Sequence, residues 1–268
     1  MISPSDYADS PFHGQEHQSA VETALDVALL VMENGGSTFR ANQAFQAMLN
    51  GLHLKGITAL WQLNTVTVFE QRDGQSNGQM ASRMRPIRAA GVNLSRVSAA
   101  WALARRVSTG AIAPAEIPAE IQRINALPLP YGPGVMVAIA ALTAASFSQL
   151  IGGDWGSLAL AGVAGALGQF VRLNLQARHF TSATVTLLCA LLSALVASLG
   201  LRAGWSQVVP ATLMGSVGYM MPGLVLANGF ADLISQRHLS VGLERIANAV
   251  FVFLLLTLGI AIAAALVP

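Results

Sequence analysis

The stretch "GYMMPGLVLANGFADLISQRH", residues 218–238, decides how the second half of this chain folds. It is apolar enough for a membrane helix, yet Pro222 removes a backbone donor and clashes with the preceding turn, and Gly223 weakens the helix further. The pair therefore predicts a broken helix. Backbone groups freed inside a bilayer must be buried in protein or must line a polar cavity. The break is thus either a packing kink that neighbouring helices satisfy or part of a solute site, as in transporters with discontinuous helices.

Asn228 and Asp232 follow the break and lie four residues apart, so they share one helical face. We predict that this face lines a polar site. Asp232 is then a candidate for proton coupling, or a partner of Arg237 or Arg245 at the inner membrane surface. Arg172 ends an earlier apolar segment, where it can bind a substrate carboxylate or extend to lipid phosphate.

The composition is that of a membrane protein. Of 268 residues, 53% are hydrophobic and 10% are charged, against about 25% charged in a typical soluble domain. Residues 1–131 hold 10 Lys/Arg and 10 Asp/Glu, and residues 132–268 hold 5 and 3. The chain therefore divides near Tyr131, within the stiff linker "LPLPYGP". The net charge of +2 comes from scattered arginines, which excludes an electrostatic case for a nucleic-acid partner.

The first half predicts a small α/β domain at residues 18–131, after a disordered leader at residues 1–17. Apolar residues recur at helical spacing up to the Asn34-Gly35-Gly36 stop, and Ser37 can cap the next helix. A strand rich in aromatic and β-branched residues follows at 58–71, closing on an Asp73-Gly74 hairpin turn with a second strand at 79–87. Further helices are expected at residues 93–108 and 114–124.

The second half, residues 132–268, predicts five membrane spans. A span needs roughly 20 apolar residues, and five segments qualify, at residues 134–151, 156–173, 183–201, 208–230 and 246–267. Four arginines near span ends fall on one side if the N-terminal domain is cytoplasmic, and only Arg202 falls on the other. The predicted fold class is a membrane α-helical bundle of five transmembrane helices, the fourth broken at Pro-Gly, preceded by a small cytoplasmic α/β domain. The C-terminus is then periplasmic or extracellular.

Other polar positions in the membrane half admit structural explanations. The turn "GGDWG" places Gly152, Gly153, Asp154 and Trp155 between two spans, where solvent exposure accounts for Asp154. The glycines of the second span favour close helix packing. Ser146, Ser148 and Gln149 near the end of the first span can hydrogen-bond either a neighbouring helix or a solute.

Signatures of enzymes and cofactor proteins are absent from the sequence. It contains no nucleophile elbow, P-loop, CxxC or HExxH motif, and its five histidines form no ligand-spaced set. The single cysteine, Cys189, can form no internal disulfide. We therefore expect no enzyme activity, no metal and no cofactor.

Four stretches resemble the threonine/serine exporter family. "LLVMENGGSTFRANQAFQAMLNGLHL" and "SRMRPIRAAGVNLSRVSAAWALA" are similar to its cytoplasmic domain, including Gly35 and Asn93. "FSQLIGGDWGSLALAGVAGALGQFVR" resembles the turn between its first two spans, and "MMPGLVLANGFADLISQRHLSVGLERIANA" its proline-glycine break and the start of its last span. The positions that match family motifs in the membrane half are Gly152, Gly153, Trp155, Pro222, Gly223, Asn228, Asp232 and Arg245.

The resemblance implies a gradient-driven secondary exporter of serine and threonine or of dicarboxylates such as succinate, in a bacterial inner membrane. Full-length members carry two membrane halves, whereas this chain has one. It therefore resembles the larger, YjjP-like subunit of the split form, whose short membrane partner supplies the second half of a hetero-oligomer. The substrate-binding residues expected on this basis are Pro222, Gly223, Asn228, Arg172 and Arg245, with Asp232 exchanging a proton. The alternative is a membrane-anchored sensor or scaffold whose cytoplasmic domain binds a ligand or partner.

Overall fold

A computed structural model describes residues 15–71, 80–88 and 91–267. These residues form two compact units. The N-terminal unit contains the residues up to Pro130 together with Leu224–Ile246, and the membrane unit contains Tyr131–Gly223 and the residues from Ala247 onward. The first boundary coincides with the composition change near Tyr131, but residues 224–246 group with the first half of the chain. Their contacts, described below, explain why.

The N-terminal unit opens with two antiparallel helices, α1 (Gln15–Glu33) and α2 (Thr38–Gly51). Ser37 caps α2 by accepting a hydrogen bond from the amide of Arg40, as the sequence predicts, and such a cap contributes about 1 kcal/mol. Helix α1 begins at Gln15, three residues before the predicted domain start, and the rest of the predicted leader lies outside the described residues.

A three-stranded antiparallel sheet follows, in the order β1 (Ile57–Trp61), β2 (Thr65–Gln71) and β3 (Met80–Pro86). The single strand predicted at residues 58–71 is wrong: it is two strands, because the chain reverses over residues 62–64, where the amide of Gln62 donates to the carbonyl of Thr65. The predicted Asp73-Gly74 turn lies outside the described residues. Arg83 and Arg85 on β3 pair with Glu22 and Asp26 on α1, which fixes the sheet against that helix.

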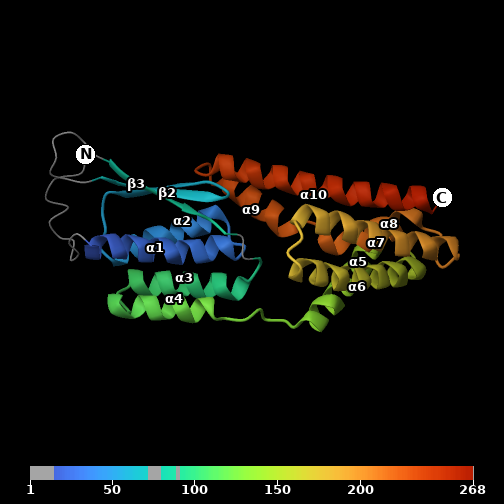
Figure 1. The fold of residues 1–268 in the computed structure, drawn as a ribbon, viewed down its shortest axis with the longest axis horizontal. Coiled ribbons are helices and arrows are strands. Elements are labelled where there is room, and N and C mark those ends of the chain that lie inside the picture. The colour runs from blue at the N-terminus through green and yellow to red at the C-terminus, as the bar shows by residue number, and fades with distance from the viewer. Residues whose placement is uncertain (1–14, 72–79, 89–90, 268) are drawn as a thin grey trace. The chain divides into compact units, whose positions relative to one another are not determined.

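Two more helical segments complete this part, α3 (Leu94–Ser108) and the short η2 (Pro114–Glu116) that continues into α4 (Ile117–Asn125). In Figure 1 the sheet and the α3–α4 pair lie on opposite sides of α1 and α2. The core of this unit includes the buried side chains of Phe45 and Met48 of α2 and Leu103 of α3. The unit is completed by α9 (Gly223–Ile234) and the first turns of α10 (Leu239–Leu266).

The membrane unit is built from α5 (Pro133–Leu150), α6 (Trp155–Ala177), α7 (Ser182–Arg202), α8 (Val209–Val217), the 3₁₀ turn η3 (Gly218–Met220) and the rest of α10. Four helices, α5, α6, α7 and α10, are individually long and apolar enough to cross a membrane. The predicted fourth span at 208–230 is broken, as predicted, into the pair Val209–Met220 and Gly223–Ile234, which makes five spans only if the pair counts as one.

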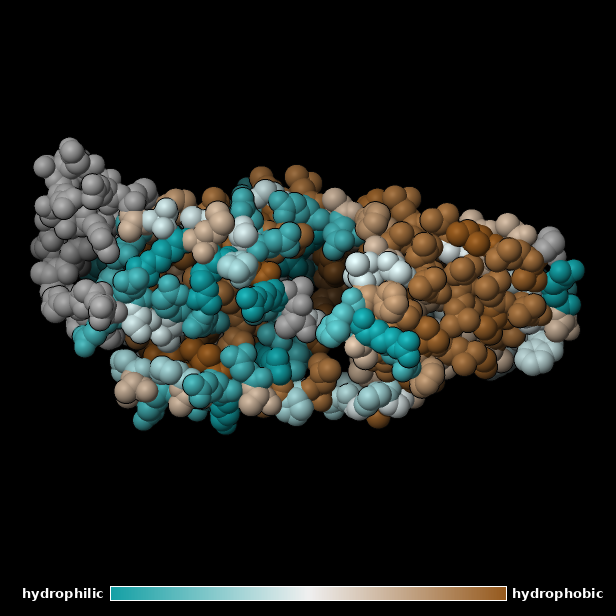
Figure 2. Space-filling model, in the orientation of Figure 1, coloured by the Kyte–Doolittle hydropathy of each residue, from teal (hydrophilic) through white to brown (hydrophobic). Residues whose placement is uncertain are grey.

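Small residues bring the helices of this unit together. A Cβ atom on Gly165 would lie 2.6 Å from the Cβ of Ala144, so α6 can approach α5 only with glycine there. Gly156 likewise faces the backbone of Trp205 with no room for a side chain. The glycines of the second span therefore serve packing at these positions. The outer surface is apolar, and Figure 2 shows hydrophobic residues covering the membrane unit on the face in view, whereas hydrophilic residues predominate over the N-terminal unit.

Candidate functional site

Asp232 is completely buried and bonded to the first turn of α2. Its Oδ1 accepts a hydrogen bond from the amide of Phe39 at 3.0 Å, and its Oδ2 accepts one from the amide of Thr38 at 3.4 Å. These amides have no partner within a helix, and a negative charge at this end is favoured by the helix dipole. A carboxylate from α9 thus completes the N-terminal end of α2.

Arg245 of α10 holds the other side of this carboxylate. Its Nε lies 3.2 Å from Asp232 Oδ2, and its Nη2 donates to the carbonyl of Gly36 at 3.3 Å. The Nε makes the ion pair without the alignment of a hydrogen bond. Asn228, one turn before Asp232, donates from Nδ2 to the carbonyl of Gly35 at 2.8 Å. These contacts bind α9 and α10 to the turn between α1 and α2.

The turn itself requires glycine. Gly35 has a φ of 95°, and a Cβ on Gly36 would lie 2.6 Å from the carbonyl oxygen of Val31. The turn is a helix–helix connection, as the sequence predicts. On the other side, a Cβ on Gly242 would lie 2.9 Å from the carbonyl oxygen of Gly229, so α9 and α10 pack closely and bring Arg245 beside Asp232.

The length of α10 is consistent with this arrangement. Its 28 residues extend about 42 Å, whereas a span needs about 30 Å. Residues 247–266 belong to the membrane unit and alone measure about 30 Å. Arg245 and the preceding turns therefore form an extension into the N-terminal unit. Asn228, Asp232 and Arg245, expected at the membrane break, are located in the N-terminal unit, and Arg237 forms no ion pair with Asp232 in the described part of the chain.

The break occurs where the sequence predicts it. Helix α8 tightens into η3, where the amide of Met221 donates to Gly218, and α9 begins at Gly223, whose amide donates to Met221. Pro222 has no amide to donate. The helical hydrogen-bond ladder is therefore interrupted at Met221 and Pro222.

A polar cluster lies beside this break inside the membrane unit, and we call it the Arg172 cluster: Arg172 of α6, Ser193 of α7 and Tyr219 of η3. Tyr219 Oη lies 3.4 Å from Ser193 Oγ, which also donates to the carbonyl of Ala164 at 3.2 Å. Arg172 follows Gly168 by four residues on α6, so it lies one turn further along the same face. Gly168 makes the cluster possible, because a Cβ there would overlap Tyr219 Oη and Ser193 Oγ.

Arg172 has no acidic partner in its unit. The only acidic residue among positions 131–223 and 247–268 is Asp154, and no ion pair of Arg172 occurs among the described residues. Sequence reasoning identified Arg172 but missed Ser193 and Tyr219. Their only sequence signal is polarity within apolar runs, and helix packing decides which of them meet.

Asp154 is engaged in the turn between α5 and α6. Its Oδ1 accepts hydrogen bonds from the amide of Ser157 at 2.6 Å and from the hydroxyls of Ser157 and Ser206, each at 2.8 Å. These bonds, the Ser157 amide first, hold the pKa of Asp154 well below its usual range. Gly152 has a φ of 86°, and Trp155 is 83% exposed. This turn fixes the start of α6.

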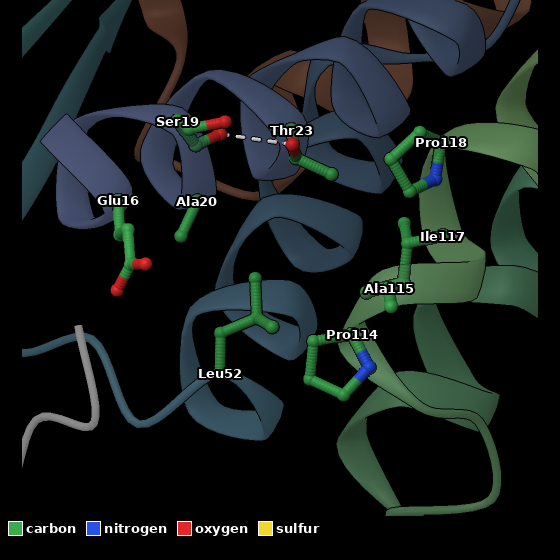
Figure 3. A pocket seen from close by; sticks show the side chains of 9 residues that line it. All are labelled: Glu16, Ser19, Ala20, Thr23, Leu52, Pro114, Ala115, Ile117 and Pro118. Atoms are coloured by element: carbon green, nitrogen blue, oxygen red, sulfur yellow. Dashed lines mark hydrogen bonds between the residues drawn. The ribbon is translucent and has the colours of Figure 1, made fainter.

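The N-terminal unit contains a separate cavity of about 410 Å³ between α1, the end of α2 and the η2–α4 segment. Figure 3 shows Glu16, Ser19 and Thr23 of α1 facing Leu52 and the prolines of η2 and α4. Glu16 is its only charged lining residue, so the cavity is unsuited to a carboxylate solute. No group of three possible metal ligands occurs in the portion of the chain that the structure describes.

Comparison with known proteins agrees with this architecture. No curated protein and no solved structure matches the chain. A family model described as "Putative threonine/serine exporter" (ThrE) matches residues 22–267, nearly the whole chain, including both units. The chain is thus a multi-pass membrane protein, and it belongs to the threonine/serine exporter family, which is a family of transporters.

Proposed function

We propose that this protein exports serine, threonine or a small dicarboxylate such as succinate across a bacterial inner membrane, driven by an ion or proton gradient. The N-terminal unit would be cytoplasmic and the C-terminus would lie on the far side. Family membership supports export of serine and threonine. The positive-inside distribution of arginines supports the orientation.

The observation that carries the proposal is the unpaired charge of Arg172 in the membrane unit. An arginine within a span carries an insertion cost, about 2.5–3.5 kcal/mol at the centre and less toward the ends, and Arg172, near the end of α6, has no carboxylate in its unit to offset that cost. All the proposed solutes carry a carboxylate, which a guanidinium binds through two parallel hydrogen bonds. We assign Arg172 as the carboxylate anchor, with the hydroxyls of Tyr219 and Ser193 beside it.

Pro222 and Gly223 remain in the proposed site because they follow Tyr219 by three and four residues and interrupt the helical hydrogen-bond ladder beside the Arg172 cluster. The predicted roles of Asn228, Arg245 and Asp232 require a conformational change that releases their present hydrogen bonds. Asn228 and Arg245 are bonded to Gly35 and Gly36, so substrate contact would require release of those bonds. Proton exchange at Asp232 would likewise require the carboxylate to leave the α2 amides.

A second membrane subunit is proposed to complete the transporter. Its position is suggested by α5, whose exposed face forms a groove of about 540 Å³ lined by Leu142, Thr143 and Ser146, among others. The Ser146 hydroxyl has no hydrogen-bond partner among the described residues, and lipid offers none in the hydrocarbon region. A partner helix that bonds Ser146 would satisfy it. Copurification with the short subunit should therefore weaken for Ser146→Leu and persist for Val163→Leu on the exposed face of α6.

Transport by vesicles that contain both subunits tests the proposal. We expect Arg172→Gln to reduce export of labelled serine or succinate about 10- to 100-fold, since a hydrogen bond to a charged group contributes about 1.5–3 kcal/mol. Arg202→Gln, an exposed arginine at the end of α7, is the matched control and should transport normally. Full transport by Arg172→Gln would remove it from the site. Absence of any transport by the two-subunit vesicles would favour the sensor or scaffold alternative.

A further inference from the structure

A groove runs along the N-terminal unit between α2 and α3. It measures about 480 Å³ and is lined by Phe39, Gln46 and Asn50 of α2, by Trp101 of α3 and by Arg237 from the α9–α10 turn. A smaller cavity of about 270 Å³ adjoins it, since both are lined by Gln43 and Trp101, and adds Arg40. We call the two together the α2 groove.

The lining of the α2 groove suits a small anion. It includes two arginines and no carboxylate. The side chains of Arg40, Gln43, Gln46, Asn50 and Arg237 form no hydrogen bond or ion pair within the described parts of the chain. Amide side chains offer both donors and acceptors, which match a hydroxyl or an ammonium group. Trp101 and Phe39 provide apolar walls for the remaining atoms of the ligand.

The groove is physically joined to the Asp232 contacts. Phe39 lines the groove through its side chain, while its backbone amide donates to Asp232. Arg237 lies in the turn that connects Asp232 on α9 to Arg245 on α10. A ligand held between Phe39 and Arg237 would therefore touch both α2, which bonds Asp232, and the turn between the two helices that the buried ion pair connects. Through α10, which continues into the membrane unit, its binding can bias the transporter.

From these observations we propose that the α2 groove is a sensing site for a small carboxylate of the exported class, an amino acid or a dicarboxylate, distinct from the Arg172 cluster. This inference rests on the proposed function for the identity of the solute. Arg237 binds the carboxylate, and the side-chain amides of Gln46 and Asn50 bind the remaining polar groups. Trp101 packs against the carbon chain. An exporter with such a site would respond to the solute concentration on the side from which it exports.

Binding to the purified full chain tests the proposal. L-serine, L-threonine and succinate are titrated by calorimetry against wild type and Arg237→Gln, and Gln46→Ala with Asn50→Ala provides a second variant on α2. We expect at least a tenfold loss of affinity in both. Arg105→Gln, an exposed arginine of α3 outside the groove, should bind normally, and circular dichroism should show all variants folded.

The outcomes separate the two proposals. Binding that survives Arg172→Gln but weakens in Arg237→Gln supports a sensing site, whether or not transport is found. Binding lost in Arg172→Gln and unchanged in Arg237→Gln overturns it and leaves the proposed transport site intact. Anionic phosphatidylglycerol vesicles form the last arm: Arg237-dependent binding to them, without binding of any of the three solutes, would identify a lipid headgroup site and also overturn the inference.

Discussion

Asp232 of α9 and Arg245 of α10 form a buried ion pair, Oδ2 to Nε at 3.2 Å, at the first turn of α2. Asp232 has no exposed surface, and Arg245 is 8% exposed. The pair connects two helices of the second half of the chain to the Gly35-Gly36 turn of the first half. It makes residues 224–246 part of the N-terminal unit.

Removing Asp232 should destabilise the N-terminal unit strongly. Asp232→Ala leaves Arg245 buried without a counter-charge and two amides of α2 without an acceptor, which we expect to cost about 3–5 kcal/mol in the free energy of unfolding. Denaturant unfolding in detergent measures this loss. Glu244→Ala, an exposed neighbour, should change stability by less than about 0.5 kcal/mol. The double variant Asp232→Leu with Arg245→Met should recover the part of the loss that comes from the unpaired charge, and a loss as large as in Asp232→Ala would contradict this explanation.

The predicted proton-coupling role of Asp232 has a different signature. Asp232→Asn keeps an acceptor for the α2 amides but cannot ionise, so gradient-driven export should fail while the folded protein persists. Uptake of labelled serine and succinate into vesicles with both subunits, with and without a proton gradient, measures this. Glu244→Gln is the control. Unchanged gradient-driven transport by folded Asp232→Asn would leave this carboxylate with a structural role only.

Gly168→Ala should impair transport more than folding. The new methyl group would overlap Tyr219 Oη and Ser193 Oγ, so it must displace the hydroxyls that we place beside Arg172. We expect at least a tenfold loss of export, with the helical content preserved. Gly162→Ala on the same helix is the matched control, since its nearest neighbour would be 3.5 Å away, an ordinary contact. Equal transport by the two variants would show that Tyr219 is not part of the solute site.

The stabilisation that Asp154 provides should depend on pH. Hydrogen bonds from Ser157 and Ser206 lower its pKa in the folded protein below the ordinary value of 3.8. Its contribution is therefore fully present above pH 3.8 and is lost as the pH falls toward the lower folded value. Melting curves should show Asp154→Asn less stable than wild type by a constant amount from pH 5 to 8, with the difference shrinking below about pH 4. If the stability difference between wild type and Asp154→Asn stays constant below about pH 4, the ionised form of Asp154 does not stabilise the turn.

Several elements could be predicted from the sequence because their causes are local. Helix caps such as Ser37 act on amides two or three residues away, and Pro222 breaks the helix that contains it. Apolar runs of span length likewise depend only on the chain's own composition. The strand at residues 58–71 was predicted without its turn, because its aromatic and β-branched content continues on both sides of residues 62–64, and propensity alone does not locate a reversal.

The sequence by itself thus determined the two-part composition, the apolar helices, the break at Pro222 and the candidate charges Arg172 and Asp232. Only the tertiary structure decided what those charges meet. Asp232 binds an amide 194 positions away and Arg245 a carbonyl 209 positions away, whereas Arg172 lies one turn beyond Gly168, which faces Tyr219, and has no carboxylate in its unit. Such partners depend on the path of the whole chain, and the physical reason is that a buried charge is stabilised by the nearest donors in space, wherever they occur in the sequence.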